Sequence, residues 1–283
     1  MTTNPALSRR SALATAAVAA VGAAGLTAGA AAPAVAAGAD APAQESAKPT
    51  VVLVHGAFAD ASSWRPVTER LQCLGYTVVA PANPLRGLAH DAAQVAAVLA
   101  TIQGPVVLAG HSYGGAVITQ AAASAPGVRA LVYIAAFMPD AGEVLGELSG
   151  RFPGSQLQPA LNPVPVPGPD GSTAIDLYIR AEKLHDVFAQ DLPASTTRLL
   201  AAGQRPLNAT AFTDTATAAA WRTLPSWTLV ATQDRGIAPD LQRFQARRAG
   251  SRTVEVPSSH LPMLSRPDAV TSLIRSAARS VTG

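Results

Sequence analysis

The sequence predicts an α/β fold in which a mostly parallel, doubly wound sheet carries an inserted helical cap. Three observations point to it. From Thr50 onward, continuous apolar runs alternate with amphipathic helical segments; a serine lies between glycines where one run ends; and residues 139–224 interrupt the alternation. Strands buried on both faces are near-continuous apolar runs, and strand–helix alternation favours a parallel sheet with helices on both faces. A chain of 283 residues is long enough for one such domain with an insertion.

The core is predicted to comprise residues 50–138 and 225–283. Its strands are short runs rich in Val, Leu and Ile, at residues 50–54, 76–80, 106–109, 129–135, 227–231 and 252–256. Helical spacing of Trp64, Val67 and Leu71 predicts a helix over residues 62–74, ended by Gly75, and a second helix is expected over residues 88–102. These units alternate as a doubly wound sheet requires.

Residues 139–224 are predicted to form the cap over the active-site mouth. Their first part, residues 153–171, is rich in proline and glycine, and we find no strong strand signal in the segment. Its second part is expected to be helical, with Tyr178, Leu184, Val187 and Phe188 on one face. The alternative is an ordinary long connection, but the segment far exceeds the usual loop length.

Residues 1–37 are predicted to be a twin-arginine export signal that is removed from the mature protein. Arg9 and Arg10 precede an alanine-rich apolar stretch, and small-residue cleavage sites follow near Val35. The alternative is a membrane anchor, but alanine and glycine are only weakly apolar, so no stable anchor is expected. Residues 38–49 are expected to be a flexible lead-in.

Charge and cysteine content exclude several classes of function. Without Arg9 and Arg10, the 21 basic residues fall to 19 against 18 acidic ones, and no basic cluster remains. Nucleic-acid binding is therefore not expected. Cys73 is the only cysteine, which excludes an intramolecular disulfide and a cysteine-based metal site.

The segment Gly110-His111-Ser112-Tyr113-Gly114 follows the apolar run at residues 106–109. It has the form G-x-S-x-G, in which a sharp strand-to-helix turn exposes a serine hydroxyl. The turn strains the serine backbone, and glycines on either side remove side chains that would collide with neighbouring elements. Ser112 is therefore the predicted nucleophile.

A serine nucleophile needs a base and a carboxylate that orients the base. His260 lies just past the last predicted strand, and Asp234 just past the strand at residues 227–231, so both should reach one edge of the sheet. The other four histidines are expected to brace loops or lie on the surface, Asp240 to cap a helix and Asp214 to lie in the cap. We predict that Asp234 and His260 complete the site.

An oxyanion formed by attack on a carbonyl requires backbone donors. The turn after the first strand and the residue after the nucleophile supply them, so the predicted donors are the N–H groups of Ala57 and Tyr113. A mostly apolar pocket is expected, with candidate walls that could equally be plain core: Phe58, Phe137, Met138, Leu261 and Met263. No metal or organic cofactor is expected.

Together these motifs resemble the α/β-hydrolase superfamily, and more narrowly its branch of plant methyl esterases, hydroxynitrile lyases and their bacterial relatives. The resemblance rests on His55-Gly56-Ala57-Phe58, Trp64, the segment from Gly110 to Gly115, Asp234 and the segment from Ser259 to Pro267. The lyases of this branch carry threonine where this chain has Gly56 and lysine where it has Leu261. The resemblance therefore implies ester hydrolysis rather than cyanohydrin cleavage.

The resulting expectation is an exported serine esterase that acts on a small to medium, mostly apolar ester or lactone through an acyl-enzyme. Two alternatives stay open. One is a hydroxynitrile lyase-like enzyme or carbon–carbon bond hydrolase with the same three residues. The other is a binding protein of this fold without turnover. The sequence does not indicate an oligomeric state.

Overall fold

A six-stranded sheet forms the centre of the fold, and every neighbouring pair in it is parallel. The computed structural model describes residues 48–168 and 171–282. The strands lie in the order β2-β1-β3-β4-β8-β9, which confirms the predicted fold class. Their bounds are β1 Thr50–Val54, β2 Val78–Val79, β3 Val106–His111, β4 Val128–Ile134, β8 Ser226–Ala231 and β9 Arg252–Val256. The predicted export signal and residues 38–47 of the predicted lead-in lie outside the described residues.

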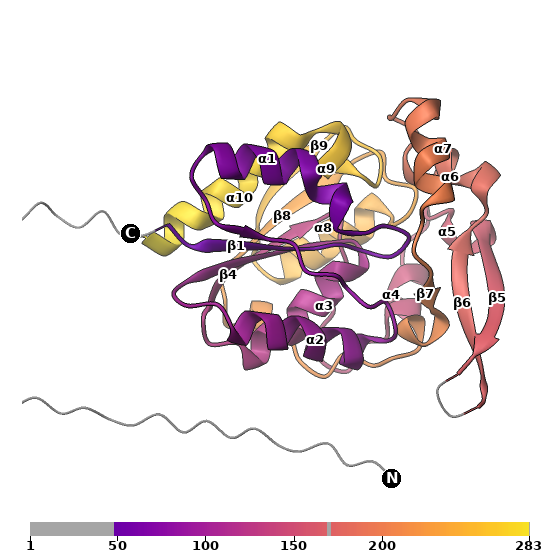
Figure 1. The fold of residues 1–283 in the computed structure, drawn as a ribbon, viewed down its shortest axis with the longest axis horizontal. Coiled ribbons are helices and arrows are strands. Elements are labelled where there is room, and N and C mark those ends of the chain that lie inside the picture. Colours follow the sequence, from indigo (N-terminus) through magenta and orange to yellow (C-terminus); the bar gives the residue numbers. More distant parts are fainter. Residues whose placement is uncertain (1–47, 169–170, 283) are drawn as a thin grey trace, which may run out of the picture. The chain divides into compact units, whose positions relative to one another are not determined.

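Helices cover both faces of this sheet. Helices α1 (Arg65–Cys73) and α10 (Pro267–Thr282) lie on one face, and α2 (Leu88–Ala100) and α3 (Tyr113–Ala121) lie on the other (Figure 1). Helix α8 (Pro239–Arg248) packs against β8, and the single-turn α9 (Pro262–Ser265) follows β9. Short 3-10 turns η1 (Ala61–Trp64) and η2 (Ala122–Ser124) begin the approach to α1 and extend α3, respectively.

Strand β2 is shorter than the predicted strand at residues 76–80. The backbone N–H of Tyr76 donates to the Leu71 carbonyl at 3.0 Å, and Gly75 adopts a φ of 76° to close the end of α1. Residue 76 therefore completes a helix cap and is not available to the sheet. Val78 and Val79 pair with β1, and the Thr77 carbonyl accepts from the Val51 N–H at 2.9 Å.

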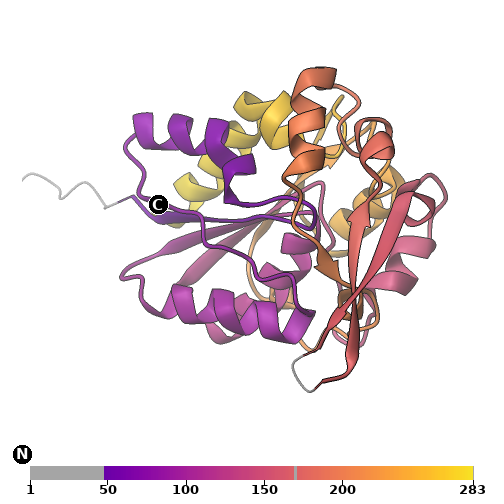
Figure 2. The same cartoon turned by 45° about the vertical axis from the view of Figure 1, so that its right-hand side comes forward.

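The cap segment is not purely helical, which corrects the prediction. It contains helices α4 (Leu145–Gly150), α5 (Leu157–Ala160), α6 (Ala181–Phe188) and α7 (Ala194–Ala202), with 3-10 turns η3 (Ala209–Phe212) and η4 (Ala220–Arg222). Strands β5 (Leu161–Pro167), β6 (Thr173–Ile179) and β7 (Leu207–Asn208) form an antiparallel sheet beside them. Tyr178, expected on a helix, belongs to β6. Figure 2 brings the β5–β6 hairpin to the front.

The proline pattern explains why the hairpin was missed. Prolines 163, 165 and 167 occupy alternate positions of β5, which is the edge strand of the cap sheet. Alternate residues direct their backbone nitrogens to the same side, so all three prolines can turn their missing N–H away from β6. A run that discourages a central strand is thus compatible with an edge strand.

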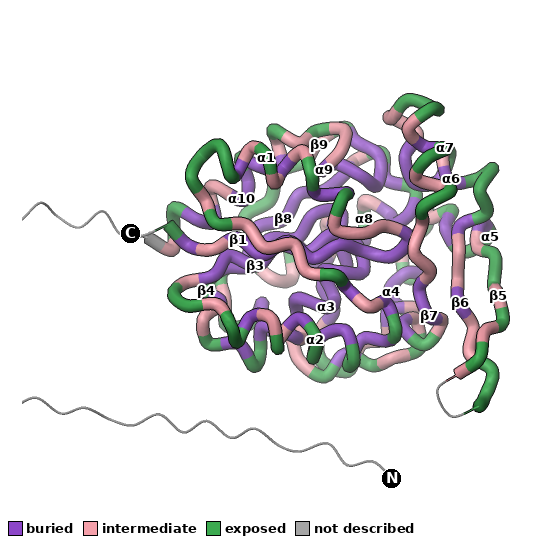
Figure 3. The backbone as a smooth tube through the Cα atoms, in the orientation of Figure 1, coloured by how far each residue is buried: buried purple, intermediate pink, exposed green. Residues whose placement is uncertain are grey.

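The apolar core lies around the central strands, as Figure 3 shows. Every residue of β3 and β8 is buried, whereas the edge strand β9 is mostly exposed. Buried cap residues such as Leu184 and Phe188 belong to the same hydrophobic cluster as the core strands. Within residues 48–168 and 171–282, no helix has both the length and the apolar character needed to cross a membrane.

Candidate active site

Ser112 lies at the carboxyl end of β3 and is the single residue between that strand and α3. Its backbone has φ 54° and ψ −124°, a strained conformation for a residue with a side chain. The Ser112 carbonyl accepts hydrogen bonds from the N–H groups of Gly115 at 2.9 Å and Phe137 at 3.1 Å. These bonds hold the strained turn in place.

Close backbone approaches make the neighbouring glycines necessary. A Cβ on Gly110 would lie 2.5 Å from the Gly114 carbonyl oxygen, and one on Gly114 would lie 2.6 Å from the Val54 carbonyl oxygen. A Cβ on Gly115 would lie 2.4 Å from the Phe137 carbonyl oxygen. Since all three neighbours are backbone atoms, none can move aside cheaply. The turn thus sits tightly between β1 and the segment after β4.

His260 and Asp234 reach Ser112 from the ends of two other strands. His260 follows β9 and Asp234 follows β8, both at the carboxyl edge where β3 also ends. The Ser112 Oγ lies 2.8 Å from His260 Nε2, and His260 Nδ1 lies 2.7 Å from Asp234 Oδ2. A carboxylate can only accept, so Nδ1 carries the imidazole proton and Nε2 is free to accept from the serine hydroxyl.

The Asp234 carboxylate is held by donors from its own loop and from α8. Its Oδ1 accepts from the N–H groups of Gly236 at 2.7 Å and Ile237 at 3.0 Å. Its Oδ2 accepts from Gln242 Nε2 at 2.7 Å in addition to His260. Gln242 is itself fixed, because its Oε1 accepts from the Ala231 N–H at 3.0 Å. The carboxylate is therefore fully paired although it is buried.

The predicted oxyanion donors belong to the turn after β1, which lies against Ser112 at Gly56, and to the residue that follows Ser112. Ala57 follows β1 and Tyr113 is the first residue of α3, and both are buried. Among the described residues, no acceptor is found for either N–H group, whereas the next N–H, that of Phe58, donates to the Arg205 carbonyl at 3.0 Å. Two unpaired buried N–H groups beside a serine at a helix start are available for a developing negative charge.

His55 and His111 brace the loops around Ser112, as predicted. His55 Nδ1 donates to the Gly56 carbonyl at 2.9 Å, and its Nε2 accepts from the Asn83 N–H at 2.9 Å. His111 Nε2 donates to the His260 carbonyl at 2.8 Å. Burial lowers the pKa of His55, and burial together with the nearby His260 holds the pKa of His111 well below its usual value. Both rings are therefore neutral supports.

Residues 51–273 match the sequence model of the alpha/beta hydrolase family. The chain belongs to the alpha/beta hydrolase family. It is 28% identical over 255 residues to the alpha/beta hydrolase nvfD of Aspergillus novofumigatus, a match that covers 82% of this chain and 97% of that protein. It is also 37% identical over 107 residues to the carbendazim hydrolyzing esterase of Nocardioides sp., covering 33% of this chain and 44% of that protein.

Among solved structures, polyneuridine aldehyde esterase has the same fold. The two structures superpose with a TM-score of 0.71 at 21% identity, over 81% of this chain and 99% of that one. The alignment therefore extends through the cap region as well as the hydrolase core. This likeness concerns the fold.

The residues predicted to line a pocket are all buried in this hydrolase. Phe58, beside Ala57, packs edge-on against Phe188 of the cap, with ring centroids 6.0 Å apart. The Phe188 ring in turn lies 4.7 Å from the His260 ring. Phe137 touches the site through its N–H bond to Ser112, and Leu261 follows His260 directly. The role of pocket walls stays a prediction for all five residues: Phe58, Phe137, Met138, Leu261 and Met263.

Sequence reasoning missed the residues that support the site from other elements. Gln242 on α8 holds Asp234, Phe188 at the end of α6 covers His260, and Asp191 after α6 accepts from Ser259. Phe188 was expected only as an apolar cap residue. Gln242 lies eight residues beyond Asp234, and a polar residue inside a helix carries no local signal of what it contacts.

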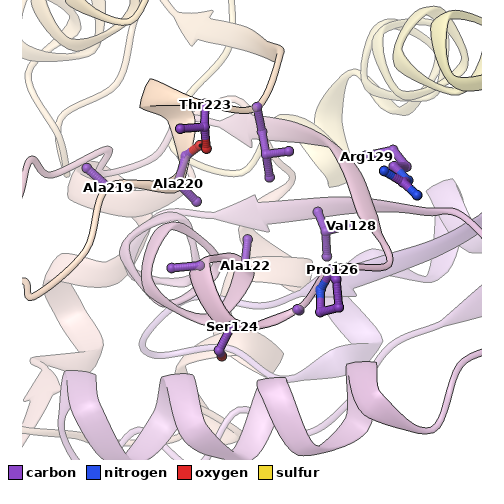
Figure 4. A pocket seen from close by; sticks show the side chains of 11 residues that line it. Ala122, Ser124, Pro126, Val128, Arg129, Ala219, Ala220 and Thr223 are labelled. Carbon is purple, nitrogen blue, oxygen red and sulfur yellow. Dashed lines mark hydrogen bonds between the residues drawn. The ribbon is translucent and has the colours of Figure 1, made fainter.

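A hollow of about 500 Å³ lies at the opposite edge of the hydrolase sheet (Figure 4). It is lined by residues around η2, the start of β4 and η4, among them Ser124, Val128, Arg129 and Thr223. Val128 begins β4, whereas Ser112 stands at the carboxyl edge of the sheet. The hollow is therefore separate from the hydrogen-bonded chain of Ser112, His260 and Asp234.

Proposed function

We propose that this hydrolase cleaves carboxylic esters through a covalent acyl-enzyme on Ser112. The observation that carries the proposal is the continuous chain from Asp234 Oδ2 through His260 to Ser112 Oγ, with distances of 2.7 and 2.8 Å. Both lie within the range at which a base takes a proton from a nucleophile. The strained turn and the unpaired N–H groups support the same reading.

In the first half-reaction, Ser112 Oγ attacks the ester carbonyl carbon while its proton passes to His260 Nε2. Asp234 keeps the imidazole in the orientation that accepts this proton and stabilises the imidazolium that forms. The N–H groups of Ala57 and Tyr113 receive the oxyanion. Collapse of the tetrahedral intermediate breaks the bond to the alcohol oxygen, which takes the proton from His260 and leaves.

The second half-reaction releases the acid. His260, again neutral, removes a proton from water, and the hydroxide attacks the acyl carbonyl within the same oxyanion site. The Ser112–acyl bond then breaks, and the proton on Nε2 returns to Ser112 Oγ. The cycle needs no redox step, and atoms and charge balance with one water consumed for each ester.

The lack of room for a side chain at Gly56 favours ester cleavage over cyanohydrin cleavage. A Cβ at this position would lie 2.7 Å from the Ser112 Cβ and 2.8 Å from the His111 carbonyl oxygen. The threonine of the resembling lyases would not fit on this backbone. Leu261 likewise offers no charge to a leaving cyanide.

The substrate class follows from the apolar surroundings and the relatives. Phe58 and Phe188 lie beside the site, and Leu261 and Met263 are buried near His260 in sequence. The matched carbendazim hydrolyzing esterase and polyneuridine aldehyde esterase are both named as esterases. We propose a small to medium, uncharged and mostly apolar ester. Export through the signal at residues 1–37 remains part of the proposal.

The test is hydrolysis of p-nitrophenyl acetate and butyrate by the purified protein. Ser112→Ala should abolish turnover and labelling by a fluorophosphonate probe, while circular dichroism stays unchanged. Ser124→Ala, in the hollow of Figure 4, is the matched control and should keep full activity. Wild-type turnover by Ser112→Ala, or loss of turnover only in Ser124→Ala, would refute the proposal.

A further inference from the structure

One short segment of the cap, from Phe188 at the end of α6 to Asp191 before α7, contacts both loops that carry Asp234 and His260. The Asp191 carboxylate accepts from the Ser259 N–H at 3.0 Å through Oδ2 and from the Ser259 hydroxyl through Oδ1. Ser259 immediately precedes His260 and is fully buried. A cap residue thus holds both donors of the residue next to the proposed base.

The rest of the segment makes two further contacts of this kind. Gln190 Nε2 donates to the Gln233 carbonyl at 2.6 Å, and Gln233 immediately precedes Asp234. The Phe188 ring packs against the His260 ring at a centroid distance of 4.7 Å. The segment therefore contacts His260 itself and the residues just before His260 and Asp234.

The Asp191 side chain is directed at the histidine loop and not at its own helix. Helix α7 begins at Ala194 without a side-chain cap bond. Burial alone would raise the pKa of Asp191, but the hydrogen bonds from Ser259 and Ser265 outweigh burial and lower it. Asp191 is accordingly ionised near neutral pH, when its bonds to the Ser259 donors are charge-assisted.

We propose that Asp191 is a positioning residue, which holds Ser259 so that His260 Nε2 stays in line with Ser112 Oγ; this role rests on the esterase function proposed above. Hydrogen bonds fix the chain at His260 and at the residue before it. Asp191 fixes the residue before it, and His111 Nε2 fixes its own carbonyl at 2.8 Å. Without Asp191 the buried Ser259 N–H loses its acceptor, and the loop must move to find another.

The experiment compares Asp191→Ala and Asp191→Asn with the wild-type protein on p-nitrophenyl butyrate. Because displacement of a reacting group by about 1 Å can cost roughly 10²-fold, Asp191→Ala should lower kcat by about that factor and change KM little. Asp191→Asn keeps one acceptor oxygen, so its kcat should lie between those of Asp191→Ala and the wild-type protein. The rate of fluorophosphonate labelling of Ser112 should drop in parallel with kcat.

Two further measurements separate positioning from general loss of structure. Ser259→Ala removes the hydroxyl bond, so Asp191→Ala combined with Ser259→Ala should lose less than the product of the two single effects. The downfield proton resonance of the His260 Nδ1–H should broaden or shift in Asp191→Ala.

Asp176→Asn is the matched control. Asp176 is also a cap carboxylate tied to the core, through Arg86 Nη1 at 2.8 Å, but among the described residues it makes no hydrogen bond to the loops of Asp234 and His260. It should keep kcat within about threefold, because its hydrogen bonds go to Arg86 and Asn208, away from the Asp234 and His260 loops. Equal losses in Asp176→Asn and Asp191→Ala would overturn the positioning role, as would unchanged kcat in Asp191→Ala. Failure of the esterase proposal is recognised separately, by turnover that survives Ser112→Ala.

Discussion

At the scale of single residues, the space around Ser112 is set by backbone atoms. Gly56, Gly110 and Gly114 each lie so close to a neighbour that a methyl group would overlap it. Gly56 differs from the other two, because its neighbours are the Ser112 Cβ and the His111 carbonyl at the reacting centre. A side chain at residue 56 would therefore displace the neighbouring Ala57 N–H.

Gly56→Ala should therefore damage both stability and turnover. The added Cβ meets the Ser112 Cβ at 2.7 Å, so the turn after β1 must shift. Overpacking of this kind costs about 1–3 kcal/mol of the free energy of unfolding. Displacing one oxyanion donor should lower kcat about 10²-fold. Urea denaturation and p-nitrophenyl ester kinetics measure the two effects.

Gly150→Ala provides the control for this substitution. Gly150 ends α4 on the surface, and nothing lies within 4 Å of an added Cβ. Its free energy of unfolding should stay within about 1 kcal/mol of wild type, with full activity. If Gly56→Ala behaves like Gly150→Ala, the Gly56 turn is not as tight as its geometry indicates.

The residues Ser112, Asp234 and His260 could be predicted because each follows a recognisable apolar strand or motif. Their meeting at one edge is a consequence of parallel topology. Asp191 and Gln242 could not be predicted in this way. Asp191 acts on Ser259 across 68 residues and Gln242 acts on Asp234 across eight, and nothing in their immediate neighbours distinguishes them from surface polar residues.

At the scale of elements, a buried carboxylate joins α2 to the helix that follows Ser112. Asp91 on α2 is fully buried and accepts from the Tyr113 hydroxyl at 2.8 Å and from the Arg86 N–H at 3.0 Å. The Arg86 guanidinium is directed to Asp176 instead. Burial raises the pKa of Asp91, against the lowering effect of these hydrogen bonds and of His90.

This raised pKa predicts the sign of a pH effect on stability. A carboxyl that binds its proton more tightly in the folded state stabilises the fold fully below its unfolded pKa of about 4. That contribution is lost as the pH rises through the folded pKa. Asp91→Asn does not titrate, so its free energy of unfolding should improve relative to wild type between about pH 4 and about pH 8. Urea denaturation at both pH values measures the change.

Glu143→Gln is the control with the opposite sign. Burial would raise the pKa of Glu143, but hydrogen bonds from Arg248 at 2.6 and 2.9 Å lower it. Its contribution is present above the unfolded pKa and lost as the pH falls. Glu143→Gln should therefore lower the free energy of unfolding more at about pH 8 than at about pH 4. A pH-independent difference between wild type and Asp91→Asn would show that Asp91 is not perturbed by burial.

The elements that could be predicted are those whose burial is uniform. Strands β1, β3, β4 and β8 are nearly continuous apolar runs because both faces are covered. The β5–β6 hairpin is half exposed, and its edge strand carries alternating prolines. Such a strand has neither a continuous run nor the usual residue preferences, so its sequence resembles that of a loop.

At the scale of the whole described chain, the cap consists of two parts that differ in their attachment. Around α6, the cap is anchored to the loops of the site by Asp191 and Gln190, and the buried side chains of α6 join the core cluster. Ser155 adds a bond from its hydroxyl to the Gly236 carbonyl at 2.8 Å. The distal half of the β5–β6 hairpin, by contrast, contains no buried residue in the parts of β5 and β6 beyond Val164 and before Asp176.

Native-state hydrogen exchange should resolve these two parts. Opening free energies follow buried apolar contacts, so amides of Leu184 to Phe188 should exchange only with the global unfolding that exposes β4. Amides at the distal end of β6, near Thr173, should exchange through a smaller local opening and reach the solvent at lower denaturant. Mass spectrometry of peptides from α6, β6 and β4 follows all three. If α6 opened together with the hairpin, well before β4, the cap would be one loosely attached unit. Stable hydrogen bonds from Ser259 in the His260 loop to Asp191 would then be excluded.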